Sequence, residues 1–396
     1  MTAAHAPLAC SAADLWGHCS GYLAMCAQVP PKTETEDTRN GVAVHWVEAL
    51  VLTSYLTAGM SPLTCGQFVG QVAPNGVVID HDHVEGAQVY VLDVLREVQR
   101  YGAMRLMRIE ERLAPSRRIH PHNWGTPDLD LRMPNIKKVV LWDYKNGRRG
   151  VRARGNLQMT SYLAGIADEL GLDGHADQQW SFEVRIVQPH FWRPSGAVDV
   201  WEGKFSDLRL AVNQLRDKAV EAFSAPTLTA GPWCRDCPAV GTCPAAAEAV
   251  AQIIDAAERP MPLAQMSDRA LGVEYRLMEQ GRRLVDAYAE AVEETLKYRI
   301  SQGSANTGYS LQVQPGRLTY TVPDAQAIAF AQLMGVDNSV VKALTPKQTL
   351  TATPAEKRPA MEMALQHIAA RAPGSAKLIP VTDTVGARVF SSQEDV

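Results

Sequence analysis

The most informative stretch of the sequence is Leu141-Trp142-Asp143-Tyr144-Lys145-Asn146-Gly147. Its apolar beginning is typical of a strand, which we expect over residues 138–144. Residues two apart on a strand share a face, so Asp143 and Lys145 project together while Tyr144 points away. A carboxylate on that face can ligate a hard divalent cation. An ammonium beside it can hold or deprotonate a water molecule and counter developing charge on phosphate.

Asp128 offers a second carboxylate upstream, in the segment Gly125-Thr126-Pro127-Asp128. It belongs to an expected strand over residues 127–132, which would lie beside the strand of Asp143 and bring both acids to one cation. Asp-x-Lys by itself is a weak signal, because any strand end can carry it and its usual role is structural.

Other residues strengthen the pattern. Glu110 lies in an expected strand over 107–113, and Gln158 and Tyr162, four residues apart, share one face of an expected helix. His45 lies in a long apolar segment with the length of a helix, where a core histidine is the simpler interpretation if nothing else is considered.

The order of the expected elements predicts an α/β layer. Strands over 107–113, 127–132 and 138–144 form an antiparallel meander, and a helix over 157–170 and a strand over 182–189 follow. Further helices are expected over these ranges: 11–27, 42–56, 85–100, 207–224, 267–302, 324–335 and 354–371. The expected fold is therefore a mixed sheet flanked by helices.

A set of residues in fixed order carries a family resemblance. The set is Ser11, Cys19, Gly41, His45, Glu110, Arg112, Gly125, Thr126, Asp128, Asp143, Tyr144, Lys145, Gly147, Asn156, Gln158 and Tyr162. With it the chain resembles the RecB-type nuclease branch of the PD-(D/E)XK superfamily. More narrowly, it is similar to a phage-encoded family of RecB-like nucleases related to the CRISPR-adaptation (Cas-type) iron-sulfur nucleases. The resemblance covers roughly residues 8–250.

The resemblance implies a restriction-endonuclease-like core and Mg²⁺- or Mn²⁺-dependent cleavage of DNA phosphodiesters in phage recombination, repair or end processing. It implies a metal site formed by His45, Asp128, Asp143 and the Tyr144 carbonyl, with Glu110, Lys145, Gln158 and Tyr162 completing the catalytic group. We expect an exonuclease. Glu110 and Glu111 are adjacent and face opposite sides of a strand, and the Glu-x-Arg pattern of the family selects Glu110.

The charge distribution allows DNA binding only through a local patch. The net charge is -4, which gives no general attraction to nucleic acid. Between Arg132 and Arg154 there are eight basic residues and one acid, Asp143. The contacts to DNA are expected from Arg148, Arg149, Arg152 and Arg154. No segment has the roughly 18 apolar residues of a membrane helix, and no basic secretory front end is present, so we expect no membrane partner and a cytoplasmic location.

The cysteines indicate a second metal or cluster site. Cys234-x-x-Cys237 and Cys243 place three thiols in one turn-rich segment, which metal or cluster binding explains better than disulfides in a cytoplasmic chain. The resemblance selects Cys19 as fourth ligand and a 4Fe-4S cluster over structural Zn²⁺, although the spacing accepts both. Cys19 is followed by Ser20 where the family has proline, so Cys10 and Cys26 stay open as substitutes.

Four regions follow from these patterns. They are an N-terminal helical segment with the first cluster cysteine (1–40), the nuclease core (41–225), the cysteine-rich cluster segment (226–258) and a separate α+β region (259–396). In the last region, strands over 309–313 and 317–322 around Pro315-Gly316 predict a hairpin. This region carries no catalytic group, and its expected roles are DNA guidance, binding of a single-strand annealing protein, or homo-oligomerisation.

Two alternative functions stay open. One is a catalytically silent DNA-binding or recombination accessory protein with the same fold. The other is a structural phage component in which the cysteines bind zinc. The intact Asp128, Asp143 and Lys145 argue against both.

Overall fold

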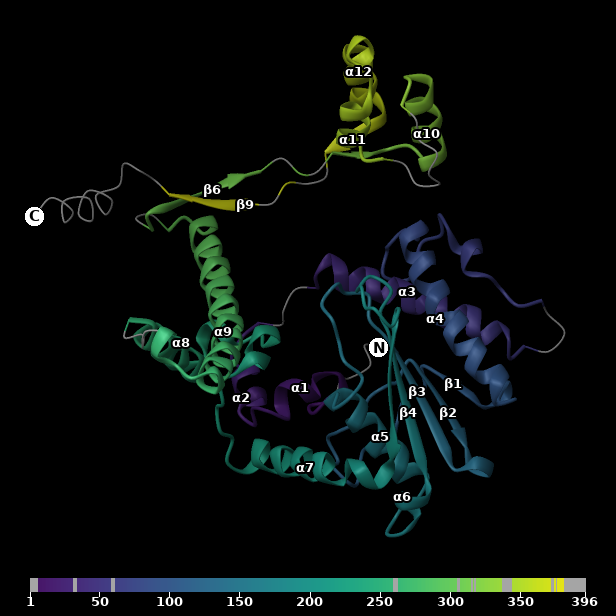
Figure 1. Ribbon diagram of the computed structural model, residues 1–396, viewed down its shortest axis with the longest axis vertical. Coiled ribbons are helices and arrows are strands. Elements are labelled where there is room, and N and C mark those ends of the chain that lie inside the picture. Colours follow the sequence, from purple (N-terminus) through teal and green to yellow (C-terminus); the bar gives the residue numbers. More distant parts are fainter. Residues whose placement is uncertain are drawn as a thin grey trace, which may run out of the picture. The chain divides into compact units, whose positions relative to one another are not determined.

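The computed structural model describes residues 6–30, 34–57, 61–258, 263–304, 307–314, 316, 318–336, 344–371, 374 and 376–380. The chain divides into two compact units, residues 1–288 and residues 289–396. Figure 1 shows both units, with labels on many of their helices and strands.

The first unit contains a five-stranded mixed sheet with the spatial order β1-β2-β3-β4-β5. The strands are β1 (Met107–Ile109), β2 (Leu129–Met133), β3 (Lys138–Tyr144), β4 (Ser181–Val187) and β5 (Val198–Lys204). Strands β3 and β4 pair in parallel and the other neighbours pair antiparallel. The sheet and its flanking helices confirm the predicted mixed α/β arrangement and the three-stranded meander. Strand β5 was not predicted.

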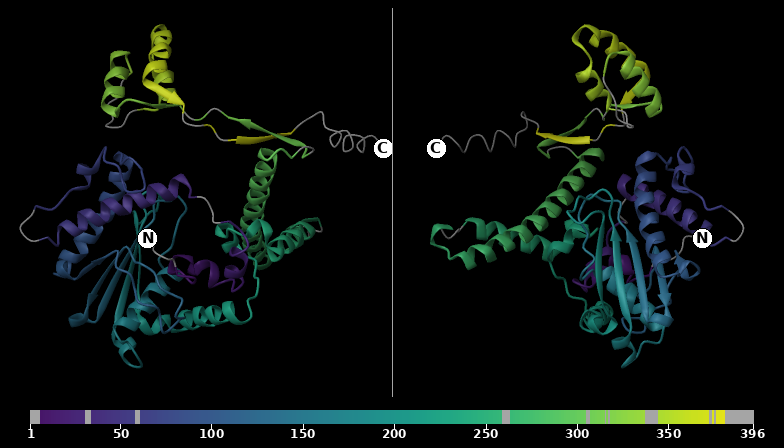
Figure 2. Two further views of the ribbon diagram at one scale, coloured as in Figure 1. Left: turned by 180° about the vertical axis from the view of Figure 1, so that it is seen from behind. Right: turned by 45° about the vertical axis from the view of Figure 1, so that its right-hand side comes forward.

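Helices cover both faces of the sheet (Figures 1 and 2). On one face lie α3 (Glu36–Ser54) and α4 (His81–Arg100), which share a core with Val140, Trp142 and Tyr144 of β3. On the other face lies α5 (Leu157–Glu169), which shares a core with Val139 and Leu141. Alternate residues of β3 therefore enter different cores, and Asp143 falls on the α5 face.

Side-chain caps fix where the core helices begin. The Thr35 side chain accepts a hydrogen bond from Thr38 N and starts α3, Asp80 caps α4, and Asn156 caps α5. Helix α3 therefore starts before the expected residue 42. Its first turn contains Glu36 and Asp37, and their negative charge is favourable at a helix N-terminus.

The remaining helices of the first unit lie outside these core layers. Helix α7 (Arg209–Ser224) contacts α5, and α9 (Asp268–Ser301) begins in this unit. The other helices are α1 (Ala13–Trp16), α2 (Tyr22–Cys26), α6 (Ala176–Gln179) and α8 (Pro244–Glu258). The helix expected over 11–27 is thus two short helices, with a turn around Gly21 where the chain bonds to Thr227.

The expected strand over residues 107–113 is shorter in the structure. Strand β1 ends at Ile109 because Glu110 adopts a φ of 51°, in the left-handed region that interrupts an extended chain. Glu110 N still donates to Asp128 O at 3.1 Å, so the two residues stay opposite each other.

In the described part of the second unit, two separate strand pairs and three α-helices follow the end of α9. Strand β6 (Tyr309–Val313) pairs with β9 (Ala376–Pro380), and β7 (Leu318–Tyr320) pairs with β8 (Ala369–Arg371). The predicted hairpin between the strands now labelled β6 and β7 is therefore wrong, because alternation identifies strands without identifying their partners. Pro315 of the predicted turn lies outside the described residues.

The helices of the second unit are α10 (Asp324–Leu333), α11 (Pro346–Ala352) and α12 (Arg358–Ile368). The expected helix over 354–371 is in fact a 3-10 turn at 355–357 followed by α12. Helix α11 was not predicted, although Thr345 and Gln348 form a capping box at its start.

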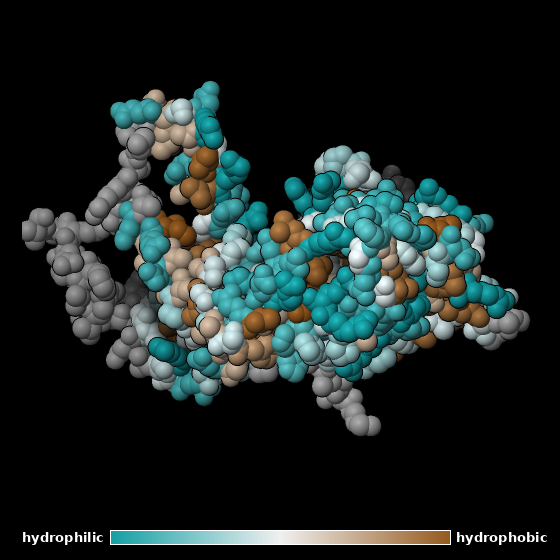
Figure 3. Space-filling view, turned by 90° about the horizontal axis from the view of Figure 1, so that it is seen from below, coloured by the Kyte–Doolittle hydropathy of each residue, from teal (hydrophilic) through white to brown (hydrophobic). Residues whose placement is uncertain are grey.

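Within the described residues, every helix is too short or too polar to span a bilayer. On the face drawn in Figure 3, hydrophobic residues are exposed in separate groups among hydrophilic ones.

Candidate metal centre and cysteine site

The sheet register aligns three acids across three neighbouring strands. Ile109 pairs with Leu129 and Leu129 pairs with Trp142, so the next row of the sheet contains Glu110, Asp128 and Asp143. A hydrogen bond of 2.7 Å from Tyr144 N to Asp128 Oδ2 holds Asp128 against β3. The acids meet because antiparallel pairing brings the end of β3 next to the start of β2.

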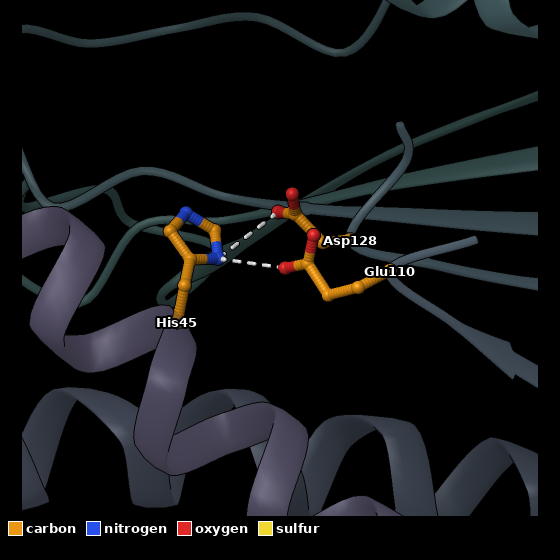
Figure 4. A group of neighbouring side chains, drawn as sticks. All are labelled: His45, Glu110 and Asp128. Atoms are coloured by element: carbon orange, nitrogen blue, oxygen red, sulfur yellow. Dashed lines mark ion pairs between the residues drawn. The ribbon is translucent and has the colours of Figure 1, made fainter. Parts of the chain in front are cut away.

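His45 of α3 approaches this row from the helix layer (Figure 4). Its Nδ1 lies 3.7 Å from Asp128 Oδ2 and 3.9 Å from Glu110 Oε1. The ligand atoms of these three residues lie within 4.8 Å of one another. One imidazole nitrogen and carboxylate oxygens form a donor set suited to Mg²⁺, Mn²⁺ or a similar cation. The residue types and their spacing therefore fit a divalent ion.

Asp143 belongs to a neighbouring hydrogen-bonded group on the α5 side. Lys145 Nζ lies 2.9 Å from Asp143 Oδ2 and donates to Gln158 Oε1 at 3.0 Å. Gln158 Nε2 donates to Asp143 Oδ1, also at 3.0 Å. Gln158 therefore bridges the acid and the ammonium and fixes both orientations.

Tyr162 supports this group from one turn further along α5. Its hydroxyl donates to Thr126 O at 3.1 Å, which ties the helix to the segment that precedes Asp128. A Cβ atom on Gly125 would lie 2.8 Å from Cε1 of Tyr162, so glycine is required there for the close approach.

Burial and mutual repulsion raise the pKa values of Asp143 and Glu110. Burial raises the pKa of Asp143 to about 6, against the lowering effect of Lys145. Burial and the charge of Asp128 raise the pKa of Glu110 to about 7. Burial disfavours the charged imidazole of His45, but the surrounding carboxylates of Asp128, Glu48 and Glu110 raise its pKa to about 10. The concentrated negative charge is the electrostatic condition for binding a cation.

The structure distinguishes Glu110 from its neighbour Glu111. Glu110 joins the group with His45, whereas Glu111 accepts a hydrogen bond from Arg108 Nε at 2.7 Å and is exposed. Arg112, the last residue of the Glu-x-Arg pattern, stacks over the Trp124 ring at 3.5 Å. Its role in the structure is packing.

Glu48 was missed by the sequence patterns. It lies one turn after His45 in α3, it is 2% exposed, and its Oε2 lies 3.4 Å from His45 Nδ1. Burial raises its pKa to about 7. The spacing His45-x-x-Glu48 was a possible signal, but the apolar residues around it made the segment resemble an ordinary core helix.

The stretch between Arg132 and Arg154 has less uncompensated positive charge in the structure than the sequence alone indicates. Lys138 lies 2.6 Å from Glu183 on β4, and Arg132 lies 2.6 Å from Glu169 on α5, so acids distant in sequence compensate both charges. Four exposed cations of the stretch are on the loop after β3, at Arg148, Arg149, Arg152 and Arg154, and exposed Lys137 lies in the turn before β3. Arg149 forms a two-fold ion pair with Asp236, with distances of 3.1 and 2.7 Å.

Buried Gln188 holds this loop in place. Its Nε2 donates to the carbonyl oxygens of Gly147 and Arg149, both at 2.6 Å, and its Oε1 accepts from Val151 N at 3.0 Å. The loop that carries the arginines is thus fixed directly after Lys145.

Four of the cysteines line one small pocket, Cys19, Cys234, Cys237 and Cys243. Thr229 N points at Cys19 Sγ and Gly231 N points at Cys234 Sγ, both at 3.4 Å. Backbone N–H donors of this kind favour thiolates at cluster sites.

Ser20 joins the two segments that supply these cysteines. Its hydroxyl accepts from Thr227 N at 2.9 Å and is fully buried. The stacked rings of His18 and Trp233, 4.4 Å apart, add a second link. Ser20 therefore has a structural role.

The two substitute ligands lie in different places. Cys10 is buried beside Ser161 and Asn123, whose side chains donate to its sulfur at 3.2 and 3.7 Å, and burial raises its pKa to about 11. Cys26 contacts Cys237, and that contact lowers its pKa to about 7. Cys10 is therefore remote from the pocket, while Cys26 lies beside it.

One protein family matches this sequence in the comparisons with known proteins. The family model described as "Protein of unknown function (DUF2800)" matches residues 5–385. Among curated proteins, none matches the sequence. A solved structure titled "Crystal structure of SSO0001" is 11% identical over 50% of this chain and 94% of that chain, with a TM-score of 0.22. That score is too low to indicate a shared fold.

Proposed function

We propose that this chain, which belongs to the DUF2800 family, is a divalent-metal-dependent deoxyribonuclease of the RecB-like branch of the PD-(D/E)XK superfamily. The observation that carries the proposal is the row of Glu110, Asp128 and Asp143 across the sheet, with Lys145 beside it and His45 opposite. Acids that can hold a divalent ion, with a fixed ammonium beside them, suit the hydrolysis of phosphodiesters.

The residues fit a cation because their donor atoms are oxygen and imidazole nitrogen. In addition, the negative charge of the carboxylates exceeds the positive charge of Lys145 and His45. His45, Asp128, Asp143 and the Tyr144 carbonyl would hold Mg²⁺ or Mn²⁺. Such an ion supplies Lewis-acid stabilisation of the phosphate and lowers the pKa of bound water.

Lys145 is the side chain that would orient the attacking water and offset charge on the phosphate. Asp143 and Gln158 fix its ammonium, so it can orient the attacking water and offset charge on the non-bridging oxygens of phosphate. Oxygen of water attacks phosphorus, the phosphorus bond to the leaving sugar oxygen breaks, and a proton ends on that oxygen. The products are a phosphate monoester and a hydroxyl.

The arginine loop would bind the DNA backbone next to this centre. Arg148, Arg152 and Arg154 are exposed on a loop held by Gln188, directly after Lys145. Phosphate contacts from such a loop would position the strand without reading its sequence.

We further propose that Cys19, Cys234, Cys237 and Cys243 hold a 4Fe-4S cluster. Four thiols face one pocket and two receive backbone N–H groups, so the donor set fits. Zinc and a 4Fe-4S cluster both accept four thiolates, and the resemblance favours the cluster.

Incubation of anaerobically purified protein with end-labelled linear DNA and closed circular DNA tests the nuclease proposal. We expect cleavage that needs Mg²⁺ or Mn²⁺, stops with EDTA and is lost in Asp143→Asn. Preference for linear DNA would identify an exonuclease. Glu111→Gln is the matched control, because this exposed acid next to Glu110 faces away from the centre. Equal cleavage by wild type and Asp143→Asn would overturn the assignment.

A further inference from the structure

Trp192 is an exposed aromatic residue that the proposed mechanism does not use. It is 82% exposed, more than any other large apolar side chain of the described residues, whereas the other seven tryptophans are buried or half-buried. Within the same residues, its indole N–H makes no hydrogen bond and its ring stacks on no other ring. The ring therefore contributes little to the packing of the fold.

The backbone on both sides of Trp192 is fixed. A Cβ atom on Gly150 would lie 2.5 Å from the Phe191 ring, so Phe191 packs closely against the arginine loop, residues 146–155. On the other side, Arg193 donates a hydrogen bond to Val151 O of the same loop, and its guanidinium lies 4.9 Å from the centre of the Phe191 ring. Trp192 thus projects from a segment that both of its neighbours hold in place. A ring fixed in this way loses little freedom when a ligand stacks on it.

The segments around Trp192 carry positive charge. Residues 146–155 and 188–197 together contain five arginines and no acid. One of the arginines, Arg149, is paired with Asp236. Three others are exposed and, within the described part of the chain, form no ion pair: Arg148, Arg152 and Arg154. A surface of this charge favours a polyanion such as nucleic acid over a neutral or basic partner.

The segment of Trp192 also reaches the proposed catalytic centre. It begins directly after Val187, whose carbonyl oxygen accepts a hydrogen bond of 2.9 Å from Lys145 N. A Cβ atom on Gly86 would lie 2.5 Å from the Tyr144 hydroxyl and 3.6 Å from His190 Nε2, so both side chains approach the same point of α4. The segment therefore lies against the end of β3 and against the arginine loop.

An exposed indole beside phosphate-binding arginines suits one form of DNA. The arginines can bind the phosphates of a single strand or of a duplex. A base offers its flat face to a side chain where it is not enclosed between neighbouring bases, as in an unpaired strand. Stacking of this kind accepts every base, because each has a π-face.

We propose that Trp192 is a stacking platform for an unpaired base of the strand whose phosphates the arginine loop binds. The proposal rests on the DNA-binding role proposed above and adds the class of substrate, a single strand or the single-stranded overhang of a duplex. The base lies on the indole face while the arginines hold the adjacent phosphates. Trp192 is a positioning residue and takes no part in breaking the phosphodiester bond.

Fluorescence anisotropy with the full-length protein in EDTA tests the proposal, because binding is then measured without cleavage. The probes are a labelled oligothymidylate, an abasic strand of the same length and a blunt duplex. Trp192→Ala should bind the oligothymidylate about tenfold more weakly than wild type, since one stacked base is lost. Trp192→Phe should keep most of the affinity. On the abasic strand and the blunt duplex, wild type and Trp192→Ala should agree within about twofold.

The matched control is Tyr275→Ala, which removes a 69% exposed ring from α9 and should bind like wild type. The slope of affinity against salt should be the same in Trp192→Ala and wild type, because no charge is removed. Equal affinity of these two proteins for the oligothymidylate would overturn the proposal. An equal loss on the abasic strand would also overturn it, and so would an equal loss on the blunt duplex, which would place the ring on a terminal base pair.

Binding and cleavage together separate this proposal from the nuclease. Weaker binding by Trp192→Ala in a protein that cleaves no DNA would contradict the nuclease and keep the stacking platform. Cleavage of DNA with an affinity that Trp192→Ala leaves unchanged would keep the nuclease and remove the platform, as would a wild type that binds none of the probes. Because Trp192 is exposed, the variant should fold, and circular dichroism verifies its fold.

Discussion

The acid centre and the cysteine site are built in opposite ways. The acids stand on α3 and on or directly beside β1, β2 and β3, whose packing and register bring them together. The cysteines stand on short helices and turns about two hundred residues apart in sequence, joined by a few contacts such as Ser20 with Thr227. The fold therefore forms the first site, whereas a bound group would be needed to complete the second.

The largest expected effect is on catalysis at the acid centre. Lys145→Ala should lower the Mg²⁺-dependent cleavage rate by about a hundredfold or more, because the fixed ammonium beside Asp143 is lost. The melting temperature should fall by a few degrees, because buried Asp143 loses its counter-charge. Single-turnover cleavage and thermal unfolding measure both quantities. A rate within about twofold of wild type would remove Lys145 from the mechanism.

The next effect concerns stability at the cysteine site. Cys19→Ser should abolish the visible absorption of the cluster and lower the melting temperature by on the order of 10 °C, because ligation links the two segments. Cys26→Ser is the matched variant, and it should keep the absorption because Cys26 lies beside the pocket without lining it. If Cys26→Ser loses the visible absorption and Cys19→Ser keeps it, then Cys26 and not Cys19 is the fourth cluster ligand.

The acid centre should also show a pH dependence. The pKa values of Asp143 and Glu110 are raised to about 6 and about 7, so protons compete with a cation below these values. Mn²⁺ affinity should rise by about tenfold per pH unit or more between pH 6 and pH 7. It should keep rising above pH 8, because His45, with a pKa raised to about 10, must lose its proton to bind the ion.

The cation-free protein should follow the opposite trend. Between the ordinary carboxyl pKa and the raised one, the folded state binds more protons than the unfolded state, so stability falls as pH rises. Calorimetric titrations and thermal unfolding at pH 6, 7 and 8 measure the two trends. An Mn²⁺ affinity that does not change with pH would contradict the shared negative charge at the acid centre.

The smallest effect, on DNA affinity, is expected where the arginine loop after β3 contacts the cysteine segment. Arg149 is paired with Asp236 of the cysteine segment, whereas Arg148 has no ion-pair partner among the described residues. Arg148→Ala should reduce the slope of DNA affinity against salt by about one, and Arg149→Ala by less. Binding to a fluorescent DNA at several salt concentrations measures both slopes. A larger loss in Arg149→Ala would show that the pair opens on DNA.

The sequence predicted the strands and helices of the core, including the pairing of β1, β2 and β3, better than the pairing of strands in the second unit. The apolar runs around β3 and α5 identified both elements, and their spacing placed Asp143 and Lys145 on one face. The hairpin after α9 was wrong, because alternation in β6 and β7 carries no information about pairing. The left-handed backbone conformation of Glu110 could not be predicted from the sequence either, because its φ depends on tertiary contacts.

Residues that act through distant partners escaped the sequence patterns. Glu48 lies among apolar residues of α3, and only the fold shows that its carboxylate faces His45. Lys138 counted as a free cation until β4 placed Glu183 beside it. Gln188 gave no signal, because its bonds to the arginine loop cross about forty residues.

The most direct test of the acid centre is the anomalous scattering of Mn²⁺ in crystals of the full-length protein. We predict a peak within about 2.5 Å of a carboxylate oxygen of Asp128, between His45 on one side and Asp143 on the other. Crystals with Mn²⁺ at saturating concentration and no peak at these residues would contradict a metal centre there, and with it the nuclease.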